Sequence, residues 1–338
     1  MGLNSKLVID SMACRDPLLP PVLRIVNGLR IVSMKLLRCL ALACTFASTA
    51  QVTVHAQSTP DGPSTDGLHC AEFKWASDAN SPHAAILVPI SMDGQQYWYQ
   101  LDTGADVVIA YGSAGHKGWI AKKDFTAVRN IQFAGMSLPI FPVFPMKQTP
   151  ASKEVQGTVG LDIFVGHAFI IDFPKQRVCL LNRADMPEAL NEAASWTPAE
   201  LRQGKLFVDN ITLNGKPLTG VIYDSGTSPE ELALDVPLWL EATGKKSTAD
   251  ATSRKFAETW GQKVEYVTAR AIGPLTIGDR TYPNALLTAS ASRPTSFHDN
   301  VNGASGALGN ALFMNSIIIL DLGSHPEFGV VNPSKLVK

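Results

Sequence analysis

The sequence has few of the patterns that indicate a bound metal, nucleotide or membrane. It contains no H-E-x-x-H and no C-x-x-C, and the histidines beyond residue 56 are scattered at positions 69, 83, 116, 167, 298 and 325. We therefore expect no metal. The G-x-S-x-G nucleophile elbow, the P-loop and the G-x-G-x-x-G fingerprint are also missing. These absences lead us to expect no cofactor.

The first apolar run is too short for a transmembrane helix. Residues 34–56 carry Lys35 and Arg38, then an apolar run that polar residues interrupt, then small residues before Gln57. A spanning helix needs about 20 apolar residues. The pattern is instead typical of a secretory signal peptide cleaved before Gln57, so we exclude this segment from the fold.

Export and charge limit the expected partners. Residues 1–33 fit neither a leader nor a domain, and our hypothesis is that translation begins at Met34. Without residues 1–56 the chain keeps 23 Lys and Arg against 28 Asp and Glu, a net charge of −5. That balance gives no indication of nucleic acid or an anionic membrane as a partner. We expect an exported protein, periplasmic or secreted.

Cysteines are scarce as well. The chain has five, and three of them precede residue 57, which leaves Cys70 and Cys179. An even pair in an exported chain favours a disulfide. This disulfide would join the first strand of the first half to its last, and closing so long a loop contributes about 4 to 5 kcal/mol in the chain-entropy model. The alternative is two buried free thiols.

The sequence repeats itself at a long interval. Residues 86–106 match 206–228: an apolar strand, a turn, a second strand and then D-[T/S]-G. The turns are Asp93-Gly94 and Asn214-Gly215. Dipeptides of this kind between apolar segments predict β-hairpins.

Two further matches follow in the same order. Residues 157–173 pair with 306–322 without a gap, and 131–145 pair more weakly with 275–288. We therefore expect a mostly β fold built from two β-barrel lobes related by a pseudo-twofold axis. The expected domains are a leader region at 1–56 with its signal peptide at 34–56, a flexible entry segment at 57–84, a first lobe at 85–182, a linker at 183–203, a second lobe at 204–332 and a tail at 333–338.

The repeated D-[T/S]-G supplies two carboxylates, Asp102 and Asp224. If the axis passes beside these turns, the two aspartates face each other. Two carboxylates a few ångströms apart do not both ionise easily, so they share one proton. The ionised group can take a proton from water while the protonated one supports a carbonyl oxygen. We predict that this pair is catalytic.

The neighbouring residues suit a supporting role. Gly104 and Gly226 allow close backbone approach and offer N–H donors. Thr103 and Ser225 supply hydroxyl groups that can bond across the interface and hold the two loops.

One position breaks the symmetry between the halves. Thr227 can donate a hydrogen bond toward Asp224, whereas Ala105 has no hydroxyl to offer Asp102. We therefore predict that Asp224 is the more readily ionised of the pair and that Asp102 more often carries the proton.

Together these motifs resemble the pepsin and retropepsin superfamily of aspartic peptidases. Each half has D-[T/S]-G after an apolar strand, then an apolar residue and glycine at Val159-Gly160 and Leu308-Gly309, then a strand ending in Asp-Phe or Asp-Leu. The resemblance covers roughly residues 85–332. It implies a two-lobed aspartic endopeptidase that acts on peptide or protein substrates without a metal or cofactor. Since two lobes complete the site, we expect a monomer.

The family closes a hairpin flap over its substrate, and here the spacing favours the second lobe. The distance from the aspartate to the later glycine is 58 residues in the first half and 85 in the second. Residues 254–272 are typical of two strands around Trp260-Gly261, our candidate flap. Residues 110–128 show no obvious hairpin. The alternative is a surface helix and loop over 235–270.

Two competing hypotheses remain. The chain could be a catalytically inactive protease-like protein that binds peptides or serves as a scaffold, although both aspartates, glycines and hydroxyl residues are present. It could also be an unrelated exported β protein with Asp-Gly turns of structural origin. The matched apolar-glycine blocks argue against this second hypothesis.

Overall fold

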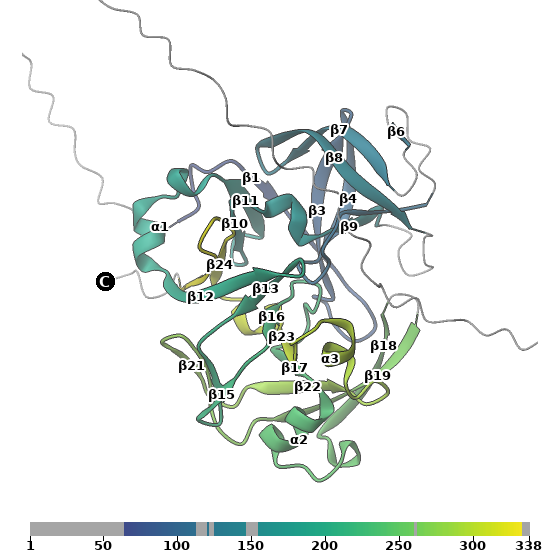
Figure 1. Cartoon of the computed structure of the whole chain (residues 1–338), viewed down its shortest axis with the longest axis vertical. Coiled ribbons are helices and arrows are strands. Elements are labelled where there is room, and N and C mark those ends of the chain that lie inside the picture. The colour runs from purple at the N-terminus through teal and green to yellow at the C-terminus, as the bar shows by residue number, and fades with distance from the viewer. Residues whose placement is uncertain (1–63, 113–119, 122–124, 147–154, 260–261, 333–338) are drawn as a thin grey trace, which may run out of the picture. The chain divides into compact units, whose positions relative to one another are not determined.

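The computed structural model describes residues 64–112, 120–121, 125–146, 155–259 and 262–332. All of them belong to one unit of the chain, Ser58–Lys338. Strands predominate (Figure 1), so the expectation of a mostly β fold is confirmed.

The first half contributes eleven of the described strands. They are β1 Cys70–Glu72, β2 Lys74–Ala76, β3 Ala85–Met92, β4 Gln95–Leu101, β5 Ile109–Tyr111, β6 Ile120–Ala121, β7 Thr126–Phe133, β8 Met136–Met146, β9 Gly157–Val159, β10 Ala168–Asp172 and β11 Arg177–Leu181.

The second half contributes the remaining described strands. They are β12 Ser195–Arg202, β13 Lys205–Val208, β14 Ile211–Leu213, β15 Lys216–Leu218, β16 Val221–Tyr223, β17 Leu232–Leu234, β18 Ser253–Thr259, β19 Gln262–Arg270, β20 Leu275–Ile277, β21 Arg280–Tyr282, β22 Leu286–Ser290, β23 Gly306–Leu308, β24 Ile317–Asp321 and β25 Glu327–Val331.

Helices are short. The α-helices are α1 Glu188–Ala193, α2 Val236–Thr243 and α3 Ser296–Asn300, and the 3-10 helices are Leu161–Phe164, Arg183–Asp185, Thr248–Asp250 and Asn310–Phe313. Helix α2 has a proline in its first turn and stops at Gly244, whose φ of 67° is left-handed. Within the described residues, no helix is long and apolar enough to cross a membrane.

The strands form three sheets, and the two halves meet in the largest. An eight-stranded sheet holds β2 to β9 of the first half. A thirteen-stranded sheet joins β1, β10 and β11 to most strands of the second half, and a four-stranded sheet has the order β15-β14-β20-β21. The junction is the antiparallel pair β10–β24, which lie side by side in Figure 1, with Ile170 opposite Ile319.

The same four pairings occur in both halves. In the first, β4–β9 is parallel, β5–β9 antiparallel, β5–β8 parallel and β7–β8 antiparallel. In the second, β16–β23 is parallel, β17–β23 antiparallel, β17–β22 parallel and β19–β22 antiparallel. The gapless match of 157–173 with 306–322 forms strand, 3-10 helix and strand in each half.

The hairpin turns fall at the predicted dipeptides. Asp93 and Gly94 have φ of 51° and 78°, and Asn214 and Gly215 have 55° and 75°, as a type I′ turn requires. The second hairpin differs from the expected single pair. Positive φ at Asn210 and at Gly220 interrupts its strands, so β13 pairs with β16 while β14 and β15 pair in the four-stranded sheet.

Equivalent aromatic residues fill the core of each half. Phe164 and Phe313, matched by the repeat, are both fully buried. Phe164 stacks on Phe169 with ring centroids 3.9 Å apart, and Phe313 packs edge to face on Phe328 at 5.6 Å. Each such side chain contributes about 1.5 to 3 kcal/mol by leaving water. In the second half the cluster also contacts Tyr223, the residue before Asp224, with ring centroids 5.2 Å apart from Phe328.

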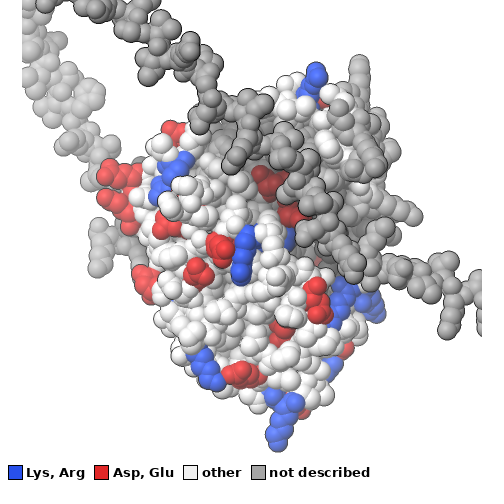
Figure 2. Space-filling view, in the orientation of Figure 1, with Lys and Arg blue, Asp and Glu red and all other residues white. Residues whose placement is uncertain are grey.

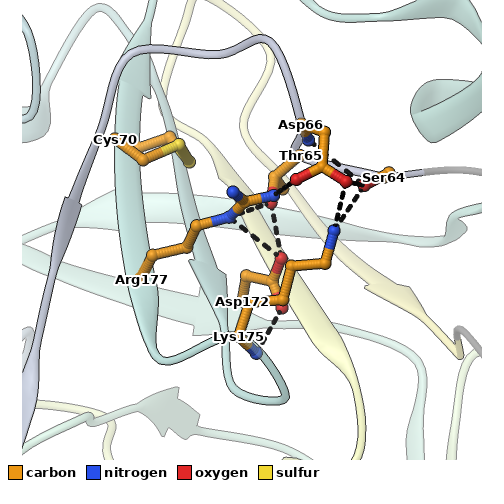
Figure 3. A network of polar contacts seen from close by, with 8 residues as sticks. Ser64, Thr65, Asp66, Cys70, Asp172, Lys175 and Arg177 are labelled. Carbon is orange, nitrogen blue, oxygen red and sulfur yellow. Dashed lines mark hydrogen bonds and ion pairs between the residues drawn. A yellow bond between two sulfur atoms is a disulfide. The ribbon is translucent and has the colours of Figure 1, made fainter.

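The entry segment differs from expectation over its described part. Residues 64–84, expected to be flexible, include β1 and β2. Residues before β1 also contact the rest of the first half (Figure 3). Asp66 accepts hydrogen bonds from Lys175 and Arg177. The Thr65 hydroxyl donates to buried Asp172. The described part of the entry segment is therefore held by partners that lie more than a hundred residues away in the sequence.

The proposed linker contains more structure than expected. Residues 183–203 include the short helix α1, as anticipated, but also β12, which pairs with β25 and β13 inside the thirteen-stranded sheet. This segment is therefore part of the fold rather than only a connection.

The predicted disulfide is confirmed. Cys70 and Cys179 are bonded and lie opposite each other on β1 and β11. The bond closes a loop with a sequence separation of 109 residues. Cys70 lies beside the polar network of Figure 3, so a covalent bond and ion pairs fasten the same segment.

Acidic and basic side chains are interspersed on the face shown in Figure 2, with no large area of one sign among the described residues. This distribution agrees with the small net charge of the chain.

Candidate active site

Two loops, one from each half, hold the predicted aspartates in the same backbone frame. Asp102 follows β4, and its N–H donates to Val159 O at 3.0 Å. Asp224 follows β16, and its N–H donates to Leu308 O at 2.9 Å. Each aspartate therefore emerges at the carboxyl end of a strand that pairs in parallel with the strand preceding the repeated glycine.

The threonine and serine beside the aspartates bond reciprocally across the two loops. Thr103 N–H donates to Ser225 Oγ at 3.0 Å, and Ser225 N–H donates to Thr103 Oγ1 at 2.9 Å. Their hydroxyls go on to Tyr223 O and Leu101 O, both at 3.2 Å. Both side chains are fully buried. Since water cannot replace these bonds, they fix one loop against the other.

The glycines of the two motifs permit a very close approach. A Cβ atom on Gly104 would lie 2.5 Å from Asp224 Cγ, and one on Gly226 would lie 2.5 Å from Asp102 Cγ. The later glycines lie as close to the loop backbones: a Cβ would meet Val107 O at 2.3 Å from Gly160 and Thr227 O at 2.1 Å from Gly309. The apolar-glycine block therefore supports each aspartate loop from behind.

Burial and mutual repulsion change the protonation of the pair. Asp102 is only 8% exposed. Its burial, followed by the charge of Asp224 and a hydrogen bond between the two carboxyl groups, raises the pKa of Asp102 well above its usual range. Asp102 therefore keeps its proton above the pH at which a free aspartate loses it.

The hydrogen bonds around the pair are asymmetric in the direction that the sequence suggested. Asp224 accepts three, from Thr227 Oγ1 at 2.7 Å, Gly226 N–H at 2.8 Å and Gly104 N–H at 3.2 Å. Asp102 accepts one from Ala105 N–H at 3.0 Å. Hydrogen bonds to a carboxylate favour its charged form, so this geometry favours a negative charge on Asp224.

A cavity of about 690 Å³ opens at the two carboxylates. Besides both aspartates it is lined by Tyr111, whose hydroxyl bonds to Thr158 at 2.9 Å, and by residues of the β2–β3 loop and of the β18–β19 hairpin. Asn80 of that loop donates to Phe256 O of the hairpin at 2.9 Å, so segments of the two halves meet at the cavity.

The hairpin expected over 254–272 is present. Strands β18 and β19 pair antiparallel from Ser253–Thr268 to Thr259–Gln262, and helix α2 precedes them, so the helix-and-loop alternative holds only for the start of 235–270. The candidate flap residues Trp260 and Gly261 lie outside the described residues. The expectation of no hairpin in 110–128 is wrong, because β6 pairs with β7.

Sequence reasoning missed residues that support the second loop. Buried Asn310 donates to Ser225 O and Ser228 Oγ, both at 2.9 Å, and accepts from the Tyr223 hydroxyl at 2.7 Å. Its counterpart in the repeat is Leu161. The polar Asn310 stands where the first copy of the repeat has the apolar Leu161, and this difference could have indicated a supporting role.

Buried Glu230 was missed as well. It pairs with Lys255 of the hairpin at 2.6 Å and accepts from the Thr288 hydroxyl. No pattern in the sequence indicated this contact. Among the described residues, no group of three potential ligands gathers to hold a metal.

Comparisons with known proteins add little to this geometry. No protein-family model matches the chain, and no curated protein sequence matches it. One solved structure that does match is the crystal structure of conglutin gamma, described as a unique basic 7S globulin from lupine seeds. The match has a TM-score of 0.46 and 12% sequence identity, and it covers 78% of this chain and 94% of that one. A likeness at this level assigns no activity.

Proposed function

We propose that the protein is an aspartic endopeptidase that hydrolyses peptide bonds with a water molecule activated between Asp102 and Asp224. The observation that carries the proposal is a pair of hydrogen-bonded carboxyl groups, Asp102 buried and Asp224 partly buried, each held by an equivalent loop and both lining one cavity. The reciprocal bonds of Thr103 and Ser225 support it, since a rigid pair is what acid and base catalysis requires.

The hydrogen bonds suggest a role for each carboxyl group. Ionised Asp224 accepts a proton from the water, and the water oxygen attacks the peptide carbonyl carbon. Protonated Asp102 gives its proton to the carbonyl oxygen, where negative charge would otherwise develop. Asp224 then gives its proton to the peptide nitrogen while one hydroxyl of the tetrahedral intermediate returns a proton to Asp102. The C–N bond breaks, and the pair regains its starting protonation. Every proton is conserved and no covalent intermediate forms.

The proposal extends to family, architecture and location. The recurrence of four strand pairings and of the turn types supports two pseudo-twofold-related lobes of the pepsin and retropepsin type. The disulfide supports export through the leader at 34–56 to the periplasm or the exterior. A site completed by one chain supports a monomer.

Proteolysis of an unfolded protein tests the proposal directly. The purified protein is assayed from pH 3 to 8 beside Asp102→Asn and Asp224→Asn, with and without a peptide inhibitor whose hydroxyl mimics the transition state. We expect cleavage that both substitutions and the inhibitor abolish. If the folded parent binds peptides but cleaves none at any pH, it is instead an inactive peptide-binding protein on a protease-like fold.

A further inference from the structure

A row of polar side chains crosses the wall of the cavity formed by the hairpin. Lys255 on β18 lies opposite Tyr266 on β19, and Tyr266 lies opposite Ser290 on β22. Directly opposed residues of antiparallel strands share one face of a sheet. All three line the same cavity as the two aspartates. The row is therefore a second chemical feature of the cavity, separate from the catalytic pair.

The row offers hydrogen-bond donors that the protein does not use. Ser290 is 9% exposed, and its buried hydroxyl has no hydrogen-bond partner among the described residues. A buried hydroxyl without a partner is costly, so such a group usually awaits a ligand or water. Lys255 gives one N–H to Glu230 at 2.6 Å, and an ammonium carries three.

Arg293 adds a charge to the same cavity. A turn connects it to Ser290, with Arg293 N–H donating to Ser290 O at 3.3 Å, and the Arg293 side chain also lines the cavity. Its guanidinium donates to the neutral amide oxygen of Gln262. Among the residues whose side chains are described, no carboxylate lies within ion-pair distance of it, whereas Lys255 is balanced by Glu230.

The acceptors of the same region are already occupied. One oxygen of Glu230 binds Lys255 and the other accepts from Thr288. The groups of the wall with hydrogen-bonding capacity left for a bound peptide are therefore a guanidinium, the buried Ser290 hydroxyl and part of an ammonium. A guanidinium binds a carboxylate through two parallel hydrogen bonds, which a neutral amide cannot equal.

We infer that Arg293, Ser290 and Lys255 form a subsite for an acidic side chain of the substrate, so that the protein selects peptides with Glu or Asp near the cleaved bond. This inference rests on the proposed endopeptidase function. It names Arg293 and Ser290 as specificity-determining residues that contact the substrate but take no part in the proton transfers.

Matched peptides that carry Glu or Gln at each position around the cleaved bond test the inference. The variants are Arg293→Gln and Ser290→Ala, with thermal unfolding to confirm that both fold. Arg254→Gln is the matched control: it lies on the same hairpin, pairs with Glu265 at 2.6 Å and is absent from the cavity lining. Arg254 also points to the opposite face of the sheet, since it is the neighbour of Lys255 along β18.

We expect the parent to cleave Glu peptides about tenfold to a hundredfold faster than Gln peptides, in kcat/KM, at one position. Arg293→Gln should remove that preference, Ser290→Ala should reduce it, and Arg254→Gln should leave it intact. A parent without the preference, or an Arg293→Gln variant that keeps it, overturns the inference.

A binding assay separates this result from the fate of the proposed function. The same peptides, labelled with a fluorophore, are bound to the Asp224→Asn protein and followed by fluorescence anisotropy. This measurement does not depend on catalysis. Suppose that the parent cleaves no peptide, and that Glu peptides still bind more tightly than Gln peptides in a way that depends on Arg293. The subsite then stands and the endopeptidase proposal falls. Equal binding of the two peptides overturns the subsite whether or not the parent is active.

Discussion

Replacing Ser225 by alanine tests whether the reciprocal bonds hold the two loops together. The change removes the acceptor of Thr103 N–H and the donor to Leu101 O, and both positions are buried. An orphaned buried N–H costs about 1 to 3 kcal/mol, and the second lost bond adds about 0.5 to 1.5 kcal/mol. The free energy of unfolding should therefore fall by about 1.5 to 4.5 kcal/mol.

Urea unfolding followed by tryptophan fluorescence measures this difference, with peptide cleavage assayed in parallel. Ser305→Ala is the control, because its hydroxyl donates to Thr219 O at an exposed site where water can substitute. We expect the control to cost well under about 1 kcal/mol. A Ser225→Ala protein as stable as this control would refute the argument that the loops depend on these bonds.

Two further predictions concern protonation and the disulfide. Because the pKa of Asp102 is raised above its ordinary value of 3.8, the folded state binds its proton more tightly, and stability should fall as pH rises from about 4 toward the raised pKa. Asp102→Asn should therefore melt at a higher temperature than the parent at pH 8 but not at pH 3; an equal difference at both would contradict the linkage. Replacing Cys70 and Cys179 by alanine should lower the free energy of unfolding by about 4 to 5 kcal/mol, given the loop of 109 residues. Urea unfolding checks this value, and an unchanged midpoint would show that the bond contributes no stability.

Much of the fold could be predicted because its signals are local. A turn dipeptide such as Asn214-Gly215 sets its own backbone geometry, and the repeat shows where equivalent strands begin. The disulfide followed from the pair of cysteines that remains after the leader region. The break of the second hairpin at Asn210 and Gly220 could not be predicted, because only pairing with β20 and β21 makes a separate sheet favourable there.

For the candidate site, the sequence alone determined which side chains are available: two aspartates, two glycines and two hydroxyl residues in repeated order. Acid and base catalysis by a pair of carboxylates is indicated by residue type and spacing, so a single sequence is enough to predict it. Tertiary structure decided which groups meet. The bonds between Thr103 and Ser225 span 122 residues, and those of Asn310 span more than 80.

The same holds for the wall of the cavity. The Glu230 and Lys255 pair, the unpartnered hydroxyl of Ser290 and the uncompensated charge of Arg293 have no mark in the sequence. The register of three strands places Lys255 and Ser290 on one face, loops bring Glu230 and Arg293 to the same cavity, and burial removes the water that would otherwise bond to these groups. Burial and register are properties of the folded chain, and the selectivity proposed here depends on both.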